Sequence, residues 1–184
     1  LHDLPSQPIV FMDEAYYEFV EAKDYPQTVR YLEEASLIIT RSFSKAYGLA
    51  GLRIGYGIAK PSLIRAMEAV REPFNVNSLA QVAACAALED GEFLQRTRRM
   101  PREGRAYLSR ELARLGRQVI PSVTNFLLVE VGPNAEQVAQ RLLARGVIVR
   151  EMSAWKLEGF VRVTIGTMPE NRRFIEALKR CLVG

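Results

Sequence analysis

The fold is decided by residues 37–59, which read LIITRSFSKAYGLAGLRIGYGIA. The stretch begins and ends with apolar runs that are typical of buried strands, and a turn centred on Lys45 separates them. Hydroxyl groups of Ser42 and Ser44 precede the lysine, and Arg53 follows it. Such a basic, donor-rich turn can hold an anionic group beside a reactive amine. We interpret it as a cofactor site, with a surface lysine in a glycine-rich loop as an equal alternative on these residues alone.

A lysine amine is a nucleophile only in its unprotonated form, which nearby positive charge and removal from water both favour. We expect Arg53 to supply the charge and the flanking apolar strands to supply the dry surroundings of Lys45. A cofactor held there by a phosphate group would pair with the two serines and the arginine.

A second strand-like run, residues 9–12, leads into Asp13, Glu14, Ala15 and Tyr16. Polar residues at the carboxyl end of an apolar strand are where open α/β sheets place their sites. A carboxylate beside a pyridine nitrogen keeps that nitrogen protonated, and the ring then accepts electrons. Tyr16 could donate a hydrogen bond to a ring oxygen. The alternative is that Asp13 caps a turn and Tyr16 packs in the interior.

Composition limits the classes of partner. The chain has 184 residues, 48% of them apolar, and a formal charge of +4, which suits an anionic small molecule but is too weak to indicate nucleic acid. No apolar run approaches the ~20 residues of a membrane span. Cys85 and Cys181 have neither metal nor redox spacing, so we predict no metal site and interpret them as buried thiols in a reducing, cytoplasmic compartment.

Strands alternating with helices predict an α/β fold, with part of a large, mainly parallel domain over residues 1–91. Residues 92–116 predict a connecting helix that Pro101 kinks or divides, and residues 117–184 a small α+β domain. The remaining elements are helices expected over 28–34, 61–72, 78–88, 134–143 and 167–182, with strands at 119–120, 125–131, 147–149 and 160–165. Capping boxes are expected for the two helices of the small domain, at Asn134–Gln137 and Thr167–Glu170.

The connecting helix is rich in arginine. A nucleic-acid surface is one interpretation, but no aromatic residues alternate with the basic ones to stack on bases. We therefore interpret the arginines as the solvated side of an amphipathic helix.

Together, Asp13-Glu14-Ala15-Tyr16 and Ser42-Phe43-Ser44-Lys45-Ala46, with Arg53 eight positions beyond the lysine, resemble the fold type I pyridoxal-phosphate aminotransferases. Within them the chain is most similar to the histidinol-phosphate aminotransferases, whose C-terminal signature matches residues 146–150 and 159–167. The resemblance implies transamination of histidinol phosphate with 2-oxoglutarate in histidine biosynthesis, by a cytoplasmic homodimer.

The resemblance also assigns roles to individual residues. Lys45 is the catalytic lysine, which forms a Schiff base with pyridoxal 5'-phosphate and moves the proton between substrate and cofactor. The cofactor-binding residues are Asp13 at the pyridine nitrogen, Tyr16 at the phenolic oxygen, and Ser42, Ser44, Lys45 and Arg53, in which the two serines and the arginine bind the phosphate.

For the substrates, histidinol phosphate and glutamate or 2-oxoglutarate, the resemblance implies that Arg162 takes the anionic group and that Arg150 assists. A planar guanidinium suits both carboxylate and phosphate. The alternative is that these arginines pair with Glu151 or Glu158 at a strand edge.

The family's glycine-rich phosphate turn, ring-stacking aromatic residue and Asn-Pro-Thr-Gly segment do not occur in this sequence. We therefore expect a C-terminal half that binds cofactor poorly alone. Residues 155–158 also depart from the family pattern, which puts the substrate loop in question.

Other functions stay open. They are a threonine-phosphate decarboxylase or aromatic aminotransferase of the same fold, a serine acylase that uses Ser42-x-x-Lys45, and a non-catalytic domain. The acylase is disfavoured because its companion Ser-Asp-Asn and Lys-Thr-Gly segments do not occur.

Overall fold

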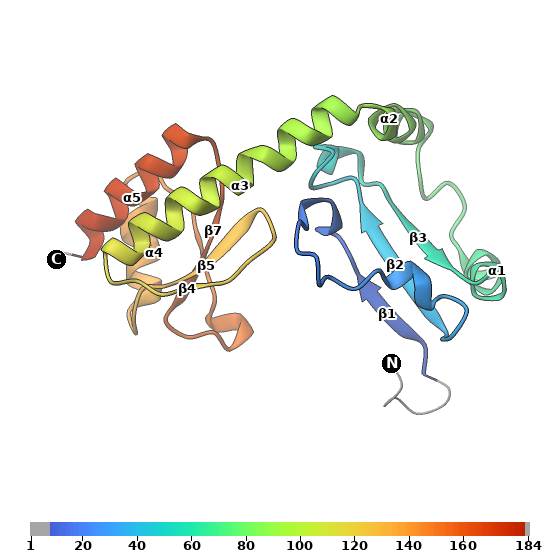
Figure 1. The fold of residues 1–184 in the computed structure, drawn as a ribbon, viewed down its shortest axis with the longest axis horizontal. Helices are drawn as coiled ribbons and strands as arrows, with labels where there is room; N and C mark the ends of the chain where they lie inside the picture. The colour runs from blue at the N-terminus through green and yellow to red at the C-terminus, as the bar shows by residue number, and fades with distance from the viewer. Residues whose placement is uncertain (1–7, 183–184) are drawn as a thin grey trace. The chain divides into compact units, whose positions relative to one another are not determined.

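The computed structural model describes residues 8–182 (Figure 1). The chain divides into two compact units, which meet within one long helix between Gln95 and Arg96. Unit 1 covers the described residues up to 95, and unit 2 covers the described residues from 96. The division into a large-domain part, a connecting helix and a small domain stays a prediction.

Unit 1 contains a three-stranded sheet in the order β1-β2-β3 (Figure 1). Its strands are β1 (Val10–Asp13), β2 (Leu37–Ser42) and β3 (Gly55–Ala59). β1 runs parallel to β2, and β3 runs antiparallel to it. The carboxyl ends of β1 and β2 therefore lie at the same edge of the sheet, as the α/β prediction requires.

Alternation along the strands gives this sheet two different faces. Leu37 and Ile39 of β2 are almost completely buried on one face. On the other face lie Ile9, which precedes β1, and Phe11; they keep 58% and 62% of their surface exposed. We call the first the covered face and the second the open face.

The other elements of unit 1 are short helices. They are the 3-10 helices η1 (Tyr17–Phe19), η2 (Thr28–Tyr31) and η3 (Ala50–Leu52), and the α-helices α1 (Pro61–Val70) and α2 (Ser78–Glu89). Pro61 opens α1 as expected, because its missing N–H would be unpaired at that position in any case. The expected helix over 28–34 is wrong in extent, since only the single turn η2 forms.

The long helix α3 runs without interruption from Gly91 to Arg114. Of the kink or division predicted at Pro101, the division does not occur, because this proline lies buried inside one continuous helix. Gly91 is the first residue of α3. Its arginines pair along the helix surface, with Arg99 bonded to Glu103 and Arg114 to Glu111.

Unit 2 packs helices against an antiparallel sheet in the order β4-β5-β7-β6. The strands are β4 (Val119–Ile120), β5 (Phe126–Glu130), β6 (Arg150–Glu151) and β7 (Phe160–Thr164), and the further helices are η4 (Ser153–Trp155), α4 (Ala135–Leu143) and α5 (Met168–Leu182). Apolar side chains of β5, β7, α3, α4 and α5 form one continuous core. Leu108, Leu142 and Leu178 are fully buried in it.

Some local expectations for unit 2 are wrong. The strand expected over 147–149 forms instead at 150–151, where Arg150 and Glu151 pair with β7. Asn134 makes no side-chain cap for α4. At α5 the expected box does form, because the Glu170 carboxylate accepts hydrogen bonds from the Thr167 N–H and hydroxyl.

The two cysteines differ in exposure. Cys181 is buried as expected, whereas Cys85 on α2 is exposed, which corrects the interpretation of both as buried thiols. Among residues 8–182, no helix is both long enough and apolar enough to cross a membrane.

Candidate functional site

The candidate site lies where β1 and β2 end. Asp13, the last residue of β1, pairs in register with Thr40, and Ser42 is the last residue of β2. Residues that are paired across two strands lie on the same face of a sheet, and so do alternate residues along one strand. Asp13, Thr40 and Ser42 therefore all lie on the open face. One Asp13 oxygen accepts a hydrogen bond from the Ala15 N–H, at 3.0 Å. Within residues 8–182 the other oxygen has no hydrogen-bond partner and can accept a proton donor.

Buried anchors hold the lysine turn in place. Phe43, Ala46 and Tyr47 are buried, and the Phe43 and Tyr47 rings lie 5.0 Å apart between centroids. The Phe43 carbonyl accepts a hydrogen bond from Leu49, which closes the turn. Since its neighbours point inward, Lys45 points outward and is exposed.

Lys45 lies close to Tyr16, the side chain that follows β1. The Lys45 Nζ is 5.5 Å from the centroid of the Tyr16 ring, within the range of a cation–π contact. The structure therefore brings together the residues that follow both strands. The dry surroundings expected for Lys45 are not provided by residues 8–182, because the side chain is exposed.

The predicted phosphate-binding residues surround the same turn. Ser42 Oγ accepts a hydrogen bond from the Ser44 N–H at 3.0 Å, and its own hydroxyl proton stays available to an anion. Arg53 has a left-handed backbone with φ of 53°, and its guanidinium donates to the Ala50 carbonyl at 2.8 Å. A non-glycine residue in this conformation costs on the order of 1 kcal/mol or more, and such strain concentrates at functional sites.

An ion pair that the sequence did not predict lies on the covered side of the site. Glu14 is buried, and its carboxylate accepts hydrogen bonds from Arg41 Nε at 3.0 Å and from the Thr28 hydroxyl at 2.5 Å. The Arg41 guanidinium also stacks on the Tyr17 ring, 3.6 Å from its centroid. Glu14 follows Asp13 and Arg41 precedes Ser42, so this pair holds the ends of both strands from behind.

The surroundings of Arg41 favour the charged form of its side chain. Burial lowers the pKa of Arg41, but hydrogen bonding with Tyr56 and with Glu14 outweighs the burial, and the pKa lies above its ordinary value. The two residues are 27 positions apart, so no local sequence pattern indicated this pair.

Unit 2 carries the two predicted substrate arginines. Arg150 of β6 and Arg162 of β7 are directly opposite each other in the sheet register. Arg150 lies over the Trp155 ring at 5.3 Å and Arg162 over the Phe126 ring at 5.2 Å. Like charges directly opposite each other repel, so a bound anion would stabilise this arrangement.

The alternative pairing of these arginines with acids does not occur among residues 8–182. Glu151 instead accepts hydrogen bonds from the Ser153 hydroxyl and N–H, at 2.7 and 2.8 Å. These bonds lower the pKa of the Glu151 carboxyl.

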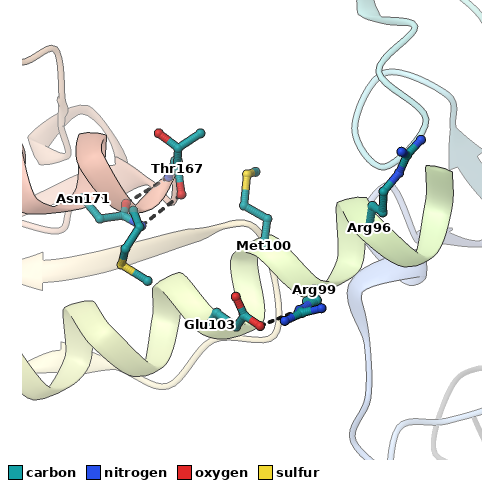
Figure 2. A pocket seen from close by; sticks show the side chains of 8 residues that line it. Arg96, Arg99, Met100, Glu103, Thr167 and Asn171 are labelled. Carbon is teal, nitrogen blue, oxygen red and sulfur yellow. Dashed lines mark hydrogen bonds and ion pairs between the residues drawn. The ribbon is translucent and has the colours of Figure 1, made fainter. Parts of the chain in front are cut away.

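A cavity of about 260 Å³ lies between α3 and the start of α5 in unit 2. Figure 2 shows Arg99 turned toward Glu103, with Thr167 and Asn171 across from them. The polar groups are already paired: Arg99 bonds Glu103, and the Asn171 amide bonds both backbone groups of Gly166. We therefore assign this cavity a structural role.

The family described as aminotransferase class I and II matches residues 6–178. The chain therefore belongs to the class I and II aminotransferases.

Individual proteins show which members of this family the chain is similar to. Histidinol-phosphate aminotransferase 1 of Nitrosococcus oceani is 49% identical over 97% of this chain, and the enzyme of Moorella thermoacetica is 45% identical over 99%. The crystal structure of histidinol-phosphate aminotransferase from Sinorhizobium meliloti, in complex with pyridoxal-5'-phosphate, matches 94% of the chain with a TM-score of 0.86 and 30% identity. The L-threonine-O-3-phosphate decarboxylase of Porphyromonas gingivalis matches 95% with a TM-score of 0.80 and 28% identity.

The match covers only part of each of these proteins. This chain spans 49% of the Nitrosococcus oceani relative, 48% of the Sinorhizobium meliloti chain and 55% of the Porphyromonas gingivalis chain. It corresponds to about half of an aminotransferase of this family.

Proposed function

We propose that this chain is the cofactor-lysine half of a pyridoxal-phosphate-dependent histidinol-phosphate aminotransferase. The complete enzyme transfers the amino group of L-histidinol phosphate to 2-oxoglutarate and gives imidazole acetol phosphate and glutamate. The observation that carries the proposal is the shared sheet face of Asp13 and Ser42, with Lys45 exposed in the turn that follows. Identity of 45–49% to histidinol-phosphate aminotransferases over nearly the whole chain supports the choice of reaction.

The side chains fit the chemistry of the cofactor. A free Asp13 oxygen suits a protonated ring nitrogen, and the hydroxyls of Ser42 and Ser44 with the Arg53 guanidinium suit a phosphate. Tyr16 suits the phenolic oxygen. When bound, pyridoxal phosphate supplies an aldehyde that takes up the amino group and a ring that takes up electrons.

The protein's own contribution is a proton transfer and the orientation of the substrate. With the cofactor bound, the Lys45 amine would take the proton from the substrate Cα, and the ammonium group so formed would give the proton to C4′ of the cofactor. Arg162 binds the anionic group of either substrate, and Arg150 assists. The paired guanidinium groups of β6 and β7 support this role because an anion would relieve their repulsion.

The complete enzyme is proposed to be a cytoplasmic homodimer that acts on small molecules. The two free cysteines are compatible with a reducing compartment.

The test joins this chain to the half of the Nitrosococcus oceani enzyme that it does not match. Histidinol phosphate, phenylalanine and threonine phosphate are compared as substrates with 2-oxoglutarate. We expect glutamate formation, fastest with histidinol phosphate. Release of carbon dioxide from threonine phosphate would instead indicate the decarboxylase, a reaction carried out by a protein of similar structure.

Two lysine variants complete the design. Lys45→Ala should abolish turnover and the visible absorption of bound cofactor, whereas Lys23→Ala, at an exposed lysine of the same unit, should change neither. Retained turnover in Lys45→Ala would contradict the assignment.

A further inference from the structure

Side chains behind the candidate site join the ends of β1 and β2. Glu14 directly follows Asp13, and Arg41 directly precedes Ser42. Since successive residues of a strand point to opposite faces, the two charged side chains lie on the covered face of the sheet, behind the site. The Glu14 carboxylate accepts a hydrogen bond from Arg41 Nε at 3.0 Å, so one ion pair bridges the two strand ends.

The same ion pair contacts both 3-10 helices that connect β1 to β2 along the chain. The Arg41 guanidinium stacks on the ring of Tyr17 in η1, 3.6 Å from the ring centroid. The hydroxyl of Thr28, the first residue of η2, donates a hydrogen bond to the other oxygen of Glu14 at 2.5 Å. We call Glu14, Tyr17, Thr28 and Arg41 the rear cluster.

Three of the predicted cofactor-binding residues are each a direct neighbour in sequence of a member of the rear cluster. The neighbouring pairs are Asp13 and Glu14, Tyr16 and Tyr17, and Arg41 and Ser42. A displacement of the cluster would therefore move all three cofactor-binding residues.

On the open face, the site residues have only local connections. Backbone pairing of β1 with β2 ends at Asp13 and Thr40, so Ser42 lies two residues beyond the last pair. The side chains of Asp13 and Ser42 each accept a hydrogen bond from a backbone N–H two residues further along the chain. Among residues 8–182, no hydrogen bond joins these two side chains to each other. Their separation therefore depends on the sheet and on the rear cluster behind it.

The rear cluster resists displacement because its charges are buried. Glu14 keeps 2% of its surface exposed, and Thr28 keeps 4%. Any movement that separated Arg41 from Glu14 would leave a buried carboxylate without its ionic partner, which is strongly unfavourable. The guanidinium uses its edge for Glu14 and its face for Tyr17, a combination that the ammonium group of a lysine does not reproduce.

We propose that the rear cluster consists of positioning residues for the cofactor, and that the separation of the three cofactor-binding residues beside it depends on Arg41. Groups that bind a ligand keep their geometry to within about 0.5 Å only when packing and hydrogen bonds behind them fix their positions. The inference rests on the cofactor part of the proposed function and not on the choice of substrate. The competing role for the cluster is stability of unit 1 alone, without an effect on cofactor binding.

The test uses the fused enzyme, which is this chain joined to the half of the Nitrosococcus oceani enzyme that it does not match. Arg41→Lys keeps the charge but loses the combined contact. We expect the Kd of pyridoxal phosphate, measured by absorption titration of the folded protein, to rise by about tenfold or more. The matched control is Arg71→Met, which breaks a half-exposed pair with Glu68 in the same unit, and it should change the Kd by less than about twofold.

A double variant separates positioning from stability. Glu14→Gln combined with Arg41→Met leaves no buried charge unpaired, so its midpoint of thermal unfolding should lie above that of Arg41→Met alone. The double variant restores neither the ionic hydrogen bond nor the stack on Tyr17. Its Kd for pyridoxal phosphate should therefore stay raised by about tenfold or more, although its stability recovers.

Two backbone amides report the geometry of the site without the cofactor. The Ala15 N–H donates to the Asp13 carboxylate. The Ser44 N–H donates to the Ser42 hydroxyl oxygen. Both amides should exchange with solvent more rapidly in the double variant of the cofactor-free fused enzyme, while the amides of α4 in unit 2 keep their rates.

The inference is overturned by an unchanged Kd in Arg41→Lys, by a Kd that recovers together with stability in the double variant, or by an unsubstituted fused enzyme that binds no pyridoxal phosphate. If Arg41→Lys does not fold, the double variant decides. An unsubstituted enzyme that binds pyridoxal phosphate but does not transaminate histidinol phosphate would contradict the proposed reaction, and the Kd values would still decide the role of the rear cluster.

Discussion

The two units of this chain differ in how completely they bury their apolar side chains. Unit 2 buries apolar side chains of β5 and β7, together with those of α3, α4 and α5, in one core, which includes Leu108, Leu142 and Leu178. Unit 1 gathers only a small cluster around its lysine turn, and the open face of its sheet stays exposed. Among the described residues unit 2 therefore has a continuous core of its own, whereas the sheet of unit 1 is covered on one face.

The strongest way to test the completeness of unit 2 is to open a cavity in its core. Leu142 and Leu143 are neighbours on α4, but Leu142 is fully buried and Leu143 is 59% exposed. Leu142→Ala should lower the free energy of unfolding by about 2–5 kcal/mol. Leu143→Ala should change it by less than about 0.5 kcal/mol. Denaturant unfolding followed by Trp155 fluorescence measures both, and equal effects would mean that unit 2 has no fixed core.

In unit 1 the buried contact to be tested is an ion pair, between Arg41 and Glu14. Arg41→Met leaves the buried Glu14 carboxylate without its ionic partner and should cost about 3 kcal/mol. Arg71→Met breaks the pair with Glu68, in which both side chains are half exposed, and should cost at most about 1 kcal/mol. Hydrogen exchange of the β1 and β2 amides reports the difference.

Restoring neutrality sharpens this prediction. Glu14→Gln combined with Arg41→Met should recover part of the loss, because no buried charge is then left unpaired. If the double variant is as unstable as the sum of the single changes, the two residues do not act as a pair.

A smaller effect is expected where α3 packs closely in unit 2. A Cβ added at Gly104 would collide with the Ile165 side chain and approach the Asn171 amide to 2.7 Å. Gly104→Ala should therefore destabilise unit 2 by about 1–3 kcal/mol. Gly91→Ala, in the same helix with nothing within 4 Å, should be neutral or slightly stabilising, and thermal unfolding compares the two.

The smallest effect concerns acid stability. Hydrogen bonds from the Thr167 hydroxyl and N–H lower the pKa of the Glu170 carboxyl below its ordinary 4.5. Because the folded-state pKa is depressed, this contribution to stability is fully present above pH 4.5 and is lost as pH falls through the folded value. Glu170→Gln should reduce the loss of stability that occurs as the pH falls below 4.5, and thermal unfolding at a series of pH values measures that loss.

The strands, the lysine turn and the family could be predicted from the sequence, because apolar runs and short motifs are local patterns. The placement of Asp13 and Ser42 on one face was not predicted, because it depends on the register that pairs Asp13 with Thr40. The Glu14–Arg41 pair could not be found by spacing, since 27 positions separate its members. The position of Arg150 opposite Arg162 likewise depends on the register of the sheet. The strand predicted over 147–149 forms three residues later, at 150–151, where it pairs with β7.

Two wrong predictions of local structure each rested on a single residue. Pro101 is accommodated inside α3, and Asn134 precedes α4 without capping it. In both cases packing of the helix against the core of unit 2 decides the outcome, and local propensity does not.

The most direct test of the central claim locates the reactive amine. The chain, joined to the half of the Nitrosococcus oceani enzyme that it does not match, is loaded with pyridoxal phosphate, reduced with borohydride, digested and analysed by mass spectrometry. The account predicts one pyridoxyl group, carried by Lys45. Labelling of another lysine, or none at all in a complex that is fully assembled, would contradict it.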